Sequence, residues 1–158
     1  MKIEKKLEEL GITLPEVSPP KAKYVPVRRV GDILYVSGHL PMKEDGSMYT
    51  GRLGFDVDVE TGQAAALRCA IGIVATLKYV IGDLDAIKGI IKLQSFVSSA
   101  PDFYEQHIVT NAASEFFVNV FGEEGQHARS AFGTAALPMN ASVEVEAIIE
   151  VHSWCTFK

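Results

Sequence analysis

The sequence predicts an α+β fold in which one sheet carries two helices on a single face. The length of 158 residues suits one domain that buries roughly 70% of its unfolded surface. Hydrophobic residues make up 47% and charged residues 22%, the balance of an ordinary globular core and not of a disordered chain. The periodicity of the apolar residues orders the elements as strand, strand, helix, strand, helix, strand, strand. The second face of such a sheet needs a partner or solvent, so we expect an oligomer.

A short helical arm is predicted before the domain. Ile3, Leu7 and Leu10 are spaced by four and three residues, which places them on one side of a helix over residues 1–10. Gly11 ends this pattern, and prolines follow it closely. We therefore divide the chain into an arm, residues 1–20, and a single domain, residues 21–158.

A β-hairpin is predicted at the start of the domain. Residues 24–30 and 33–37 are rich in strand-forming side chains, and the two residues between them, Gly31 and Asp32, are typical of a tight hairpin turn. Residues 39–62 are rich in Gly, Asp and Glu and are expected to form a long loop. Loops of this length often carry function.

Two helices with a strand between them are expected next. Thr61 is predicted to cap a helix that runs to about residue 81, and residues 90–98 are predicted to form a strand. Asp102 is expected to cap the second helix, which runs through Phe121. The apolar stripes of the two helices contain Leu67, Ile71, Val74, Val109, Ala113, Phe116 and Phe117.

The last two strands are predicted over residues 129–136 and 143–152, joined by a turn at residues 137–140. In the second of these strands apolar and polar residues alternate, so Glu144 and Glu146 project from one face. Paired carboxylates suit acid–base catalysis. A solvated strand face that carries acidic residues also explains them, and spacing alone favours that explanation.

The overall charge disfavours nucleic-acid binding. Fifteen basic residues against twenty acidic residues leave a net charge of −5 and a pI near 5.4, the wrong sign for a protein that neutralises phosphates. The start of the chain lacks the pattern of a signal peptide, and no uninterrupted apolar run reaches about 18 residues, so we expect a cytoplasmic protein without a membrane segment. The cysteine and histidine spacings predict neither a disulfide nor a metal site. Nucleotide-binding glycine motifs are missing too, and we expect no cofactor.

Arg129, at the start of a predicted strand, is the candidate anion ligand. A guanidinium in that place can bind a substrate carboxylate through two parallel hydrogen bonds, although the position taken alone favours an ordinary surface arginine. The residues alone therefore lead to an α+β domain with a candidate carboxylate-binding site.

Three segments of the chain carry a resemblance to a known family. The sequence is similar to the YjgF/Rid family, also called endoribonuclease L-PSP-like proteins, over about residues 20–152. The first two segments contain Tyr24 and Val36-Ser37-Gly38-His39-Leu40-Pro41, and the third runs from Ala128-Arg129-Ser130-Ala131-Phe132 through Leu137-Pro138 to Val143-Glu144-Val145-Glu146-Ala147.

The resemblance implies a chorismate-mutase-like fold, assembled as a homotrimer with three pockets between neighbouring subunits. It implies a function as well: the hydrolysis of reactive imines and enamines, such as 2-aminoacrylate, to 2-keto acids and ammonia. Members of this family use no metal and no organic cofactor for that reaction.

Each candidate site residue corresponds to a position of the family pattern. Arg129 matches the arginine that pairs with the substrate carboxylate, and Glu144 matches the glutamate that positions or activates water. Tyr24 is expected to line the pocket from the adjoining subunit. Ser37 and Gly38 match the segment that borders the ligand, where the Gly38 N–H is placed to bind a carboxylate.

One departure from the family pattern bears on function. Many deaminating members have a cysteine two residues after the arginine, and this chain has Ala131 there. We therefore keep two further hypotheses beside imine hydrolysis: non-catalytic binding of a small carboxylate metabolite, and cleavage of RNA. RNA cleavage would require a local basic patch formed by Arg28, Arg29, Lys88 and Lys92.

Overall fold

The computed structural model describes residues 1–19 and 22–158 of the chain, so the predicted boundary between arm and domain, at residues 20 and 21, lies outside the described residues. The predicted order of strands and helices is confirmed. The main elements are α1 (Lys2–Glu9), β1 (Val27–Val30), β2 (Ile33–His39), α2 (Val59–Ile81), β3 (Ile87–Ser98), α3 (Gln106–Phe121), β4 (Ala128–Thr134) and β5 (Val143–Val151). Three short 3-10 turns, η1 (Leu84–Ala86), η2 (Gly122–Gly125) and η3 (Pro138–Asn140), connect them.

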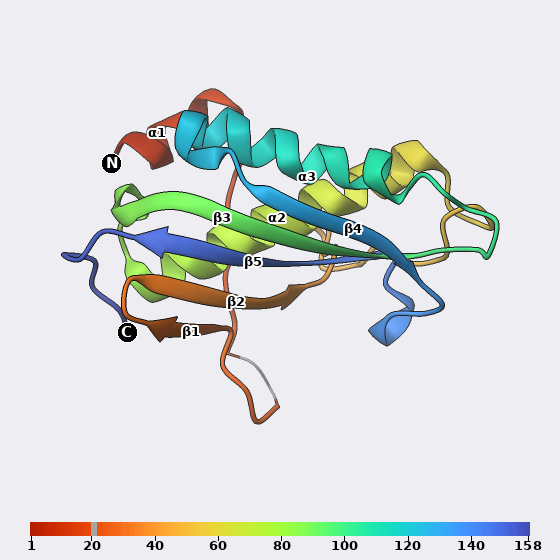
Figure 1. Cartoon of the computed structure of the whole chain (residues 1–158), viewed down its shortest axis with the longest axis horizontal. Helices are drawn as coiled ribbons and strands as arrows, with labels where there is room; N and C mark the ends of the chain where they lie inside the picture. The colour runs from red at the N-terminus through yellow and green to blue at the C-terminus, as the bar shows by residue number, and fades with distance from the viewer. Residues whose placement is uncertain (20–21) are drawn as a thin grey trace.

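The five strands form one sheet in the order β1-β2-β5-β3-β4 (Figure 1). The last strand of the chain therefore lies in the middle, antiparallel to both β2 and β3. Strands β3 and β4 run parallel, and α3 provides the crossover between them. This order leaves β1 and β4 as the two edges of the sheet.

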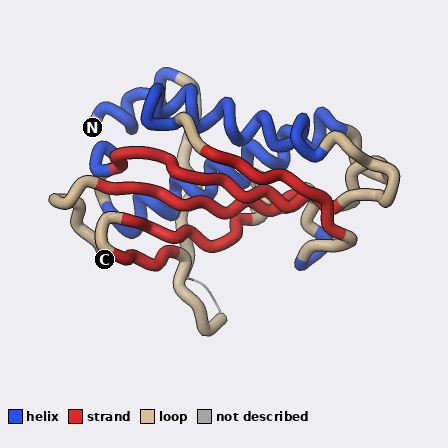
Figure 2. Tube along the Cα trace, in the orientation of Figure 1, coloured by secondary structure: helices blue, strands red, loops and turns tan. Residues whose placement is uncertain are grey.

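The helices α2 and α3 cover one face of the sheet, and in Figure 2 α2 passes behind the strands. Strand β5 alternates strictly between buried residues, which face the helices, and half-buried residues on the other face. Helix α2 has the length and composition of a membrane span, but most of it is buried here, as in the core helix of a globular domain. The largest fully buried side chains are Phe117, Leu34, Leu53, Ile73, Leu77, Ile81, Leu84 and Leu93.

The other face of the sheet carries no helix and presents several apolar side chains. Tyr35 is 50% exposed and Phe132 is 42% exposed. The rings of Phe96 and Phe132 meet edge to face with their centroids 5.0 Å apart. A face with this much exposed aromatic surface is suited to burial against another protein surface.

Both predicted helix caps are wrong. Helix α2 begins at Val59, because the Asp58 carboxylate accepts a hydrogen bond from the Thr61 N–H at 2.8 Å; Thr61 therefore lies in the first turn and is not the cap. Helix α3 begins at Gln106, four residues beyond the predicted cap, because Asp102 belongs to a turn closed by a backbone hydrogen bond from the Phe103 N–H to the Ala100 carbonyl.

The segment predicted as a loop over residues 39–62 is partly ordered by isolated β-bridges. Met42 pairs with Met48 to form a small hairpin, and Thr50 pairs with Ala141 beside β5. Leu53, which is fully buried, pairs with Ser99 at the end of β3. The segment is therefore fastened to the sheet at several points.

The N-terminal arm is fixed to the domain by both polar and apolar contacts. The Asp85 carboxylate of η1 accepts hydrogen bonds from the N–H groups of Lys2 at 2.8 Å and Ile3 at 2.9 Å, so it caps α1 from a distant part of the chain. Ile3 and Leu7 are buried in the core. Beyond α1 the arm continues along the molecule toward the end of β2, where residues 15–18 border a cavity.

Candidate functional site

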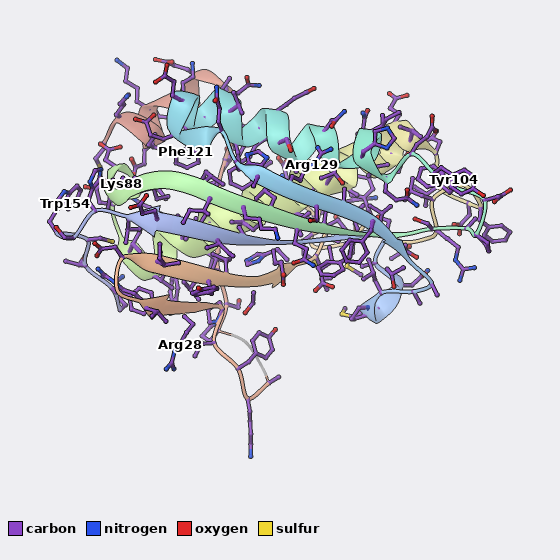
Figure 3. The ribbon with its side chains drawn as sticks, viewed as in Figure 1. Arg28, Lys88, Tyr104, Phe121, Arg129 and Trp154 are labelled. Carbon is purple, nitrogen blue, oxygen red and sulfur yellow. The ribbon has the colours of Figure 1, made fainter. Side chains whose placement is uncertain are left out.

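The five predicted site residues lie in two separate regions of one chain. Arg129 is on the edge strand β4, and Figure 3 shows it beside α3, far from Arg28 on the opposite edge strand. Ser37 and Gly38 are at the end of β2, close to Tyr24. Glu144 is on β5, the strand next to β2.

The guanidinium of Arg129 is held against helix α3. Arg129 is paired in register with Leu93, a fully buried residue, so its side chain leaves the sheet on the helix-covered side. It donates hydrogen bonds to Asn111 Oδ1 at 2.8 Å and Ser114 Oγ at 3.2 Å. A longer bond of 3.4 Å to the His107 carbonyl leaves the second terminal nitrogen weakly engaged. The arginine is thus oriented, with donor capacity remaining for a ligand.

Asn111 and Ser114, which orient the arginine, were not predicted as site residues from the sequence. They lie three residues apart on α3, a spacing that places both side chains on the same side of the helix. His127 also contacts Ser114, with its Nε2 atom 2.9 Å from the hydroxyl oxygen. Their spacing of three residues on α3 was the signal that could have placed the two polar side chains together, although α3 carries other polar residues as well.

Glu144 lies on the open face of the sheet, opposite the face from which Arg129 leaves. Burial raises the pKa of its carboxyl above the usual value, and the charge of Glu146, two residues along the same face, raises it further. Glu144 and Glu146 project from one face, as predicted. The structure therefore does not bring Arg129 and Glu144 together within one chain.

Gly38 leaves space for the Glu144 carboxylate. Ser37 and Gly38 form a bulge in β2, since Val36 pairs with Ala147 but His39 pairs with Val145. A Cβ atom placed on Gly38 would overlap the carboxylate and lie 2.9 Å from Glu144 Cδ. A side chain at residue 38 would therefore displace the Glu144 carboxylate from its present position.

His39 closes the bulge from the helix side. Its Nδ1 atom is 2.7 Å from the Ser37 carbonyl and must donate the proton there, so Nε2 accepts from the Thr76 hydroxyl at 2.8 Å. Burial lowers the pKa of the imidazole and favours its neutral form, against a smaller opposing effect of the Ser37 carbonyl. His39 is a positioning residue for the bulge that sequence analysis had left without a role.

A cavity of about 560 Å³ lies beside this bulge, beneath the N-terminal arm, and is called the arm cavity below. Residues 15–18 of the arm, the hairpin segment 40–46 and one side of α2 form its walls. Tyr24, Ser37 and Gly38, three of the predicted site residues, line it together. Arg129 and Glu144 are not among its lining residues.

A second, smaller hollow of about 320 Å³ lies on the open face of the sheet. Arg28 and Lys92 line it, but they share it with the acidic residue Glu146. The other two members of the predicted basic patch are engaged elsewhere: Arg29 lies 3.5 Å from Asp32, and Lys88 contacts Glu150 at 3.0 Å. Two of the four residues of the predicted basic patch, Arg29 and Lys88, are thus paired with carboxylates.

Three acidic residues under α1 come close enough to hold a cation, although sequence analysis assigned no metal site. The carboxylates of Glu4, Asp83 and Asp85 have oxygens within 4.8 Å of one another. Most of their oxygens have partners in the chain: Glu4 Oε1 pairs with Lys78, and Asp83 and Asp85 accept backbone hydrogen bonds, while Glu4 Oε2 is buried without a hydrogen-bond partner among the described residues. These contacts explain the cluster as the anchor of the arm.

The chain matches a known protein family over most of its length. A family model described as YjgF/chorismate mutase-like, with a provisional endoribonuclease designation, matches residues 4–151. The chain belongs to this family. The YjgF family match begins within α1 and extends to the end of β5, so it covers both the arm cavity and the sheet.

Individual YjgF-like relatives are similar over most of their length. Protein TCP17 of Trypanosoma cruzi is 46% identical over 148 residues, which are 93% of this chain and 92% of that protein. A protein of Lactococcus lactis provisionally named as a regulator, AldR, is 32% identical over 131 residues, covering 82% and 88% of the two chains.

Solved structures have the same fold. The Agrobacterium tumefaciens protein Atu1372, described as of unknown function, is 50% identical with a TM-score of 0.89, covering 96% of this chain and 93% of its own. A Shewanella oneidensis protein provisionally named an endoribonuclease is 31% identical with a TM-score of 0.90, over 94% and 99% of the two chains. These similarities establish the family and the fold, and leave the reaction to be argued from the site.

Proposed function

We propose that this protein hydrolyses reactive imine and enamine metabolites to 2-keto acids and ammonia, without a cofactor, at pockets formed between the copies of a homotrimer. One observation supports the proposal: Arg129, the proposed carboxylate ligand, is oriented by Asn111 and Ser114 at one edge of the sheet, while the residues expected to border the substrate lie near the other edge. The family resemblance supports the role of each residue.

The separation of the two groups supports a site shared between chains. Two strands, β5 and β3, lie between β2 and β4. At about 4.8 Å per strand spacing, Arg129 and Gly38 are separated by at least about 14 Å across the sheet. A substrate of a few carbon atoms cannot span that distance. A second copy that brings its β4 edge to the β2 end would complete the site, and the exposed Tyr35 and Phe132 offer apolar surface for such an assembly.

The chemistry required of the site is modest. Arg129 holds the substrate carboxylate and orients the C=N carbon. Glu144 accepts a proton from water as the water oxygen bonds to that carbon, and the imine nitrogen takes up a proton. Collapse of the tetrahedral adduct moves the hydroxyl proton to the nitrogen, through Glu144 or solvent, as the C=O bond forms and the C–N bond breaks, releasing ammonia. An enamine first takes up a proton on carbon and becomes the imine. Glu144 suits this role because its raised pKa makes it a better base than an ordinary glutamate.

The proposal is tested by generating imines in situ with an amino acid oxidase or a dehydratase and trapping the remainder with semicarbazide. We expect the wild-type protein to shorten the lifetime of the imine, and Arg129→Ala and Glu144→Gln to remove most of the effect. Arg52→Ala, an exposed arginine in a loop, is the matched control. Sedimentation of each variant tests the trimer separately. A wild-type protein that is no faster than buffer would refute the proposal.

A non-catalytic ligand sensor is the second candidate. Two observations favour it: a 32% identical relative carries the name of a regulator, and Ala131 provides neither a thiol nor a hydrogen-bonding group. This function predicts binding of pyruvate or 2-ketobutyrate without turnover, with binding lost in Arg129→Ala. Calorimetry and the imine assay on the same preparation separate the two candidates.

RNA cleavage is the least favoured candidate, although the family description carries it. The net charge of −5 and the engagement of Arg29 and Lys88 with carboxylates oppose binding to a polyanion. RNA affinity that falls steeply with salt would revive this function, and its absence would remove it.

A further inference from the structure

Arg68 of helix α2 has an unusual environment for a surface-helix arginine. Its side chain is only 14% exposed and lies in the wall of the arm cavity. Its Nε atom donates a hydrogen bond to the Met42 carbonyl at 2.8 Å, which fixes the orientation of the guanidinium plane. Arg68 was not among the residues singled out from the sequence, since its contacts depend on the hairpin at residues 42–48.

The charge of Arg68 is poorly compensated by the described part of the chain. The acidic group that approaches it is Glu44, whose Oε1 atom lies 3.9 Å from Arg68 Nη1, at the outer limit for an ion pair. The Glu44 side chain is 84% exposed, so this interaction is largely screened by water. A guanidinium cannot lose its proton, and its burial is costly without a close anionic partner. The N–H groups of both terminal nitrogens of Arg68 are thus available to donate hydrogen bonds to an anion.

The remaining walls of the arm cavity suit a small polar ligand. Tyr24, Ser37 and Lys43 border the same space. The Ser37 hydroxyl donates to the Val25 carbonyl at 2.9 Å, and Lys43 Nζ lies 4.5 Å from the centroid of the Tyr49 ring. Glu16 and Glu44 also border it, so the cavity is close to neutral and recognition depends on short contacts to Arg68 more than on long-range attraction. The volume of about 560 Å³ accommodates a metabolite.

We propose that the arm cavity is a binding site for a small oxyanion ligand, a carboxylate or a phosphate, held by the Arg68 guanidinium. This site is formed by one chain, and Arg68 lies on α2 rather than on β4. The arm cavity shares Tyr24, Ser37 and Gly38 with the expected border of the site that requires Arg129 of a second copy. The two sites differ in the arginine that binds the anion, and binding through Arg68 does not depend on imine hydrolysis.

The test is to titrate the full chain with pyruvate in one experiment and with inorganic phosphate in another. Binding is followed by calorimetry and by NMR of the arginine Nε–H groups. We expect at least one of the two anions to shift the Arg68 Nε–H signal. We expect Arg68→Gln to weaken that binding by about tenfold or more, since a charge-assisted hydrogen bond is lost. Arg28→Gln, in the hollow of the open face, is the matched control and should retain the affinity.

Arg129→Gln separates this site from the proposed active site. Pyruvate binding that survives Arg129→Gln and is lost in Arg68→Gln supports the arm cavity, and the reverse pattern overturns it. Failure of both anions to shift the wild-type Arg68 signal also overturns it, whatever the folding of the variants. A shift by phosphate alone assigns the ligand class to phosphates, and a shift by pyruvate alone assigns it to carboxylates.

Discussion

The Glu144 carboxylate lies in the space that a side chain at residue 38 would occupy. A Cβ atom on Gly38 would come within 2.9 Å of Glu144 Cδ and still closer to its oxygen. The bulge in β2 brings the two residues together, since it displaces Gly38 from the regular pairing with β5. The position of the Glu144 side chain therefore depends on the backbone of β2 at Gly38.

Gly38→Ala should therefore displace the carboxylate and reduce imine hydrolysis strongly while leaving the fold intact. The atoms in conflict are at the far end of a flexible side chain, so we expect the free energy of unfolding to fall by only about 0.5–1 kcal/mol. Gly89→Ala is the control, because the nearest atom to its Cβ is 3.8 Å away. Equal activity in the two variants would show that the position of Glu144 is unimportant.

The pH dependence of activity should report the raised pKa of Glu144. If its carboxylate accepts the proton from water, kcat/KM rises with pH through a pKa above that of an ordinary glutamate. Part of the shift comes from the charge of Glu146, so Glu146→Gln should move the acidic limb to lower pH. An acidic limb that does not move in Glu146→Gln would argue against Glu144 as the base.

Local patterns of the sequence predicted the elements well, because their causes are local. The two-residue turn at Gly31 and Asp32 and the alternation over residues 143–151 correspond directly to the hairpin and the central strand. The cap at Thr61 was wrong because Asp58, three residues earlier, accepts the hydrogen bond from the Thr61 N–H, and the cap at Asp102 was wrong because that residue belongs to a turn before α3, whose start has no side-chain cap.

The site was less predictable, since its parts meet through long-range packing. Spacing placed Glu144 and Glu146 on one face, but no pattern in residues 128–134 indicated that Arg129 turns toward α3. The order of the strands puts β5 between β2 and β3, which separates Arg129 from Gly38. Arg68 depends on a hairpin within a segment that reads as a loop, so its role follows only from the folded chain.

Asp85 is expected to control the docking of the N-terminal arm. Burial alone would raise the pKa of its carboxyl, but hydrogen bonds from the Ile3 and Lys2 N–H groups and the nearby N-terminus lower it to about 2. The folded-state pKa lies below the unfolded one. The stabilisation that the ionised Asp85 carboxylate gives to the folded chain is therefore complete above about pH 4 and is lost as the pH falls toward 2.

Asp85→Ala should weaken the attachment of α1 by about 1 kcal/mol, as expected for the loss of a helix cap. Hydrogen exchange of the α1 amides should become faster near pH 7, while the exchange of α2 and the sheet stays unchanged. Asp102→Ala, in an exposed turn, serves as the control. Unchanged exchange in α1 would mean that the apolar contacts of Ile3 and Leu7 suffice to hold the arm.

His39 should make the stability of the bulge depend on pH. Burial favours the neutral imidazole, so its folded-state pKa lies below the ordinary value of about 6.5. The neutral His39 contributes fully to the free energy of unfolding above about pH 6.5. This stabilisation is lost as the pH falls toward the lower folded-state pKa, because the unfolded chain binds the proton more readily. Protonation would also remove the lone pair that accepts the Thr76 hydroxyl proton.

We therefore expect the free energy of unfolding of the wild-type protein to decrease as the pH falls from about 6.5 to 5. This decrease should be absent in His39→Gln. Thr76→Val gives a complementary result at pH 7.5, where the loss of the hydroxyl leaves the buried Nε2 atom without its donor and costs about 1–3 kcal/mol. Denaturant titrations at several pH values measure both effects, with Thr61→Val on the exposed side of α2 as the control. Identical pH profiles for wild type and His39→Gln would place the acid sensitivity of the fold in its carboxylates instead.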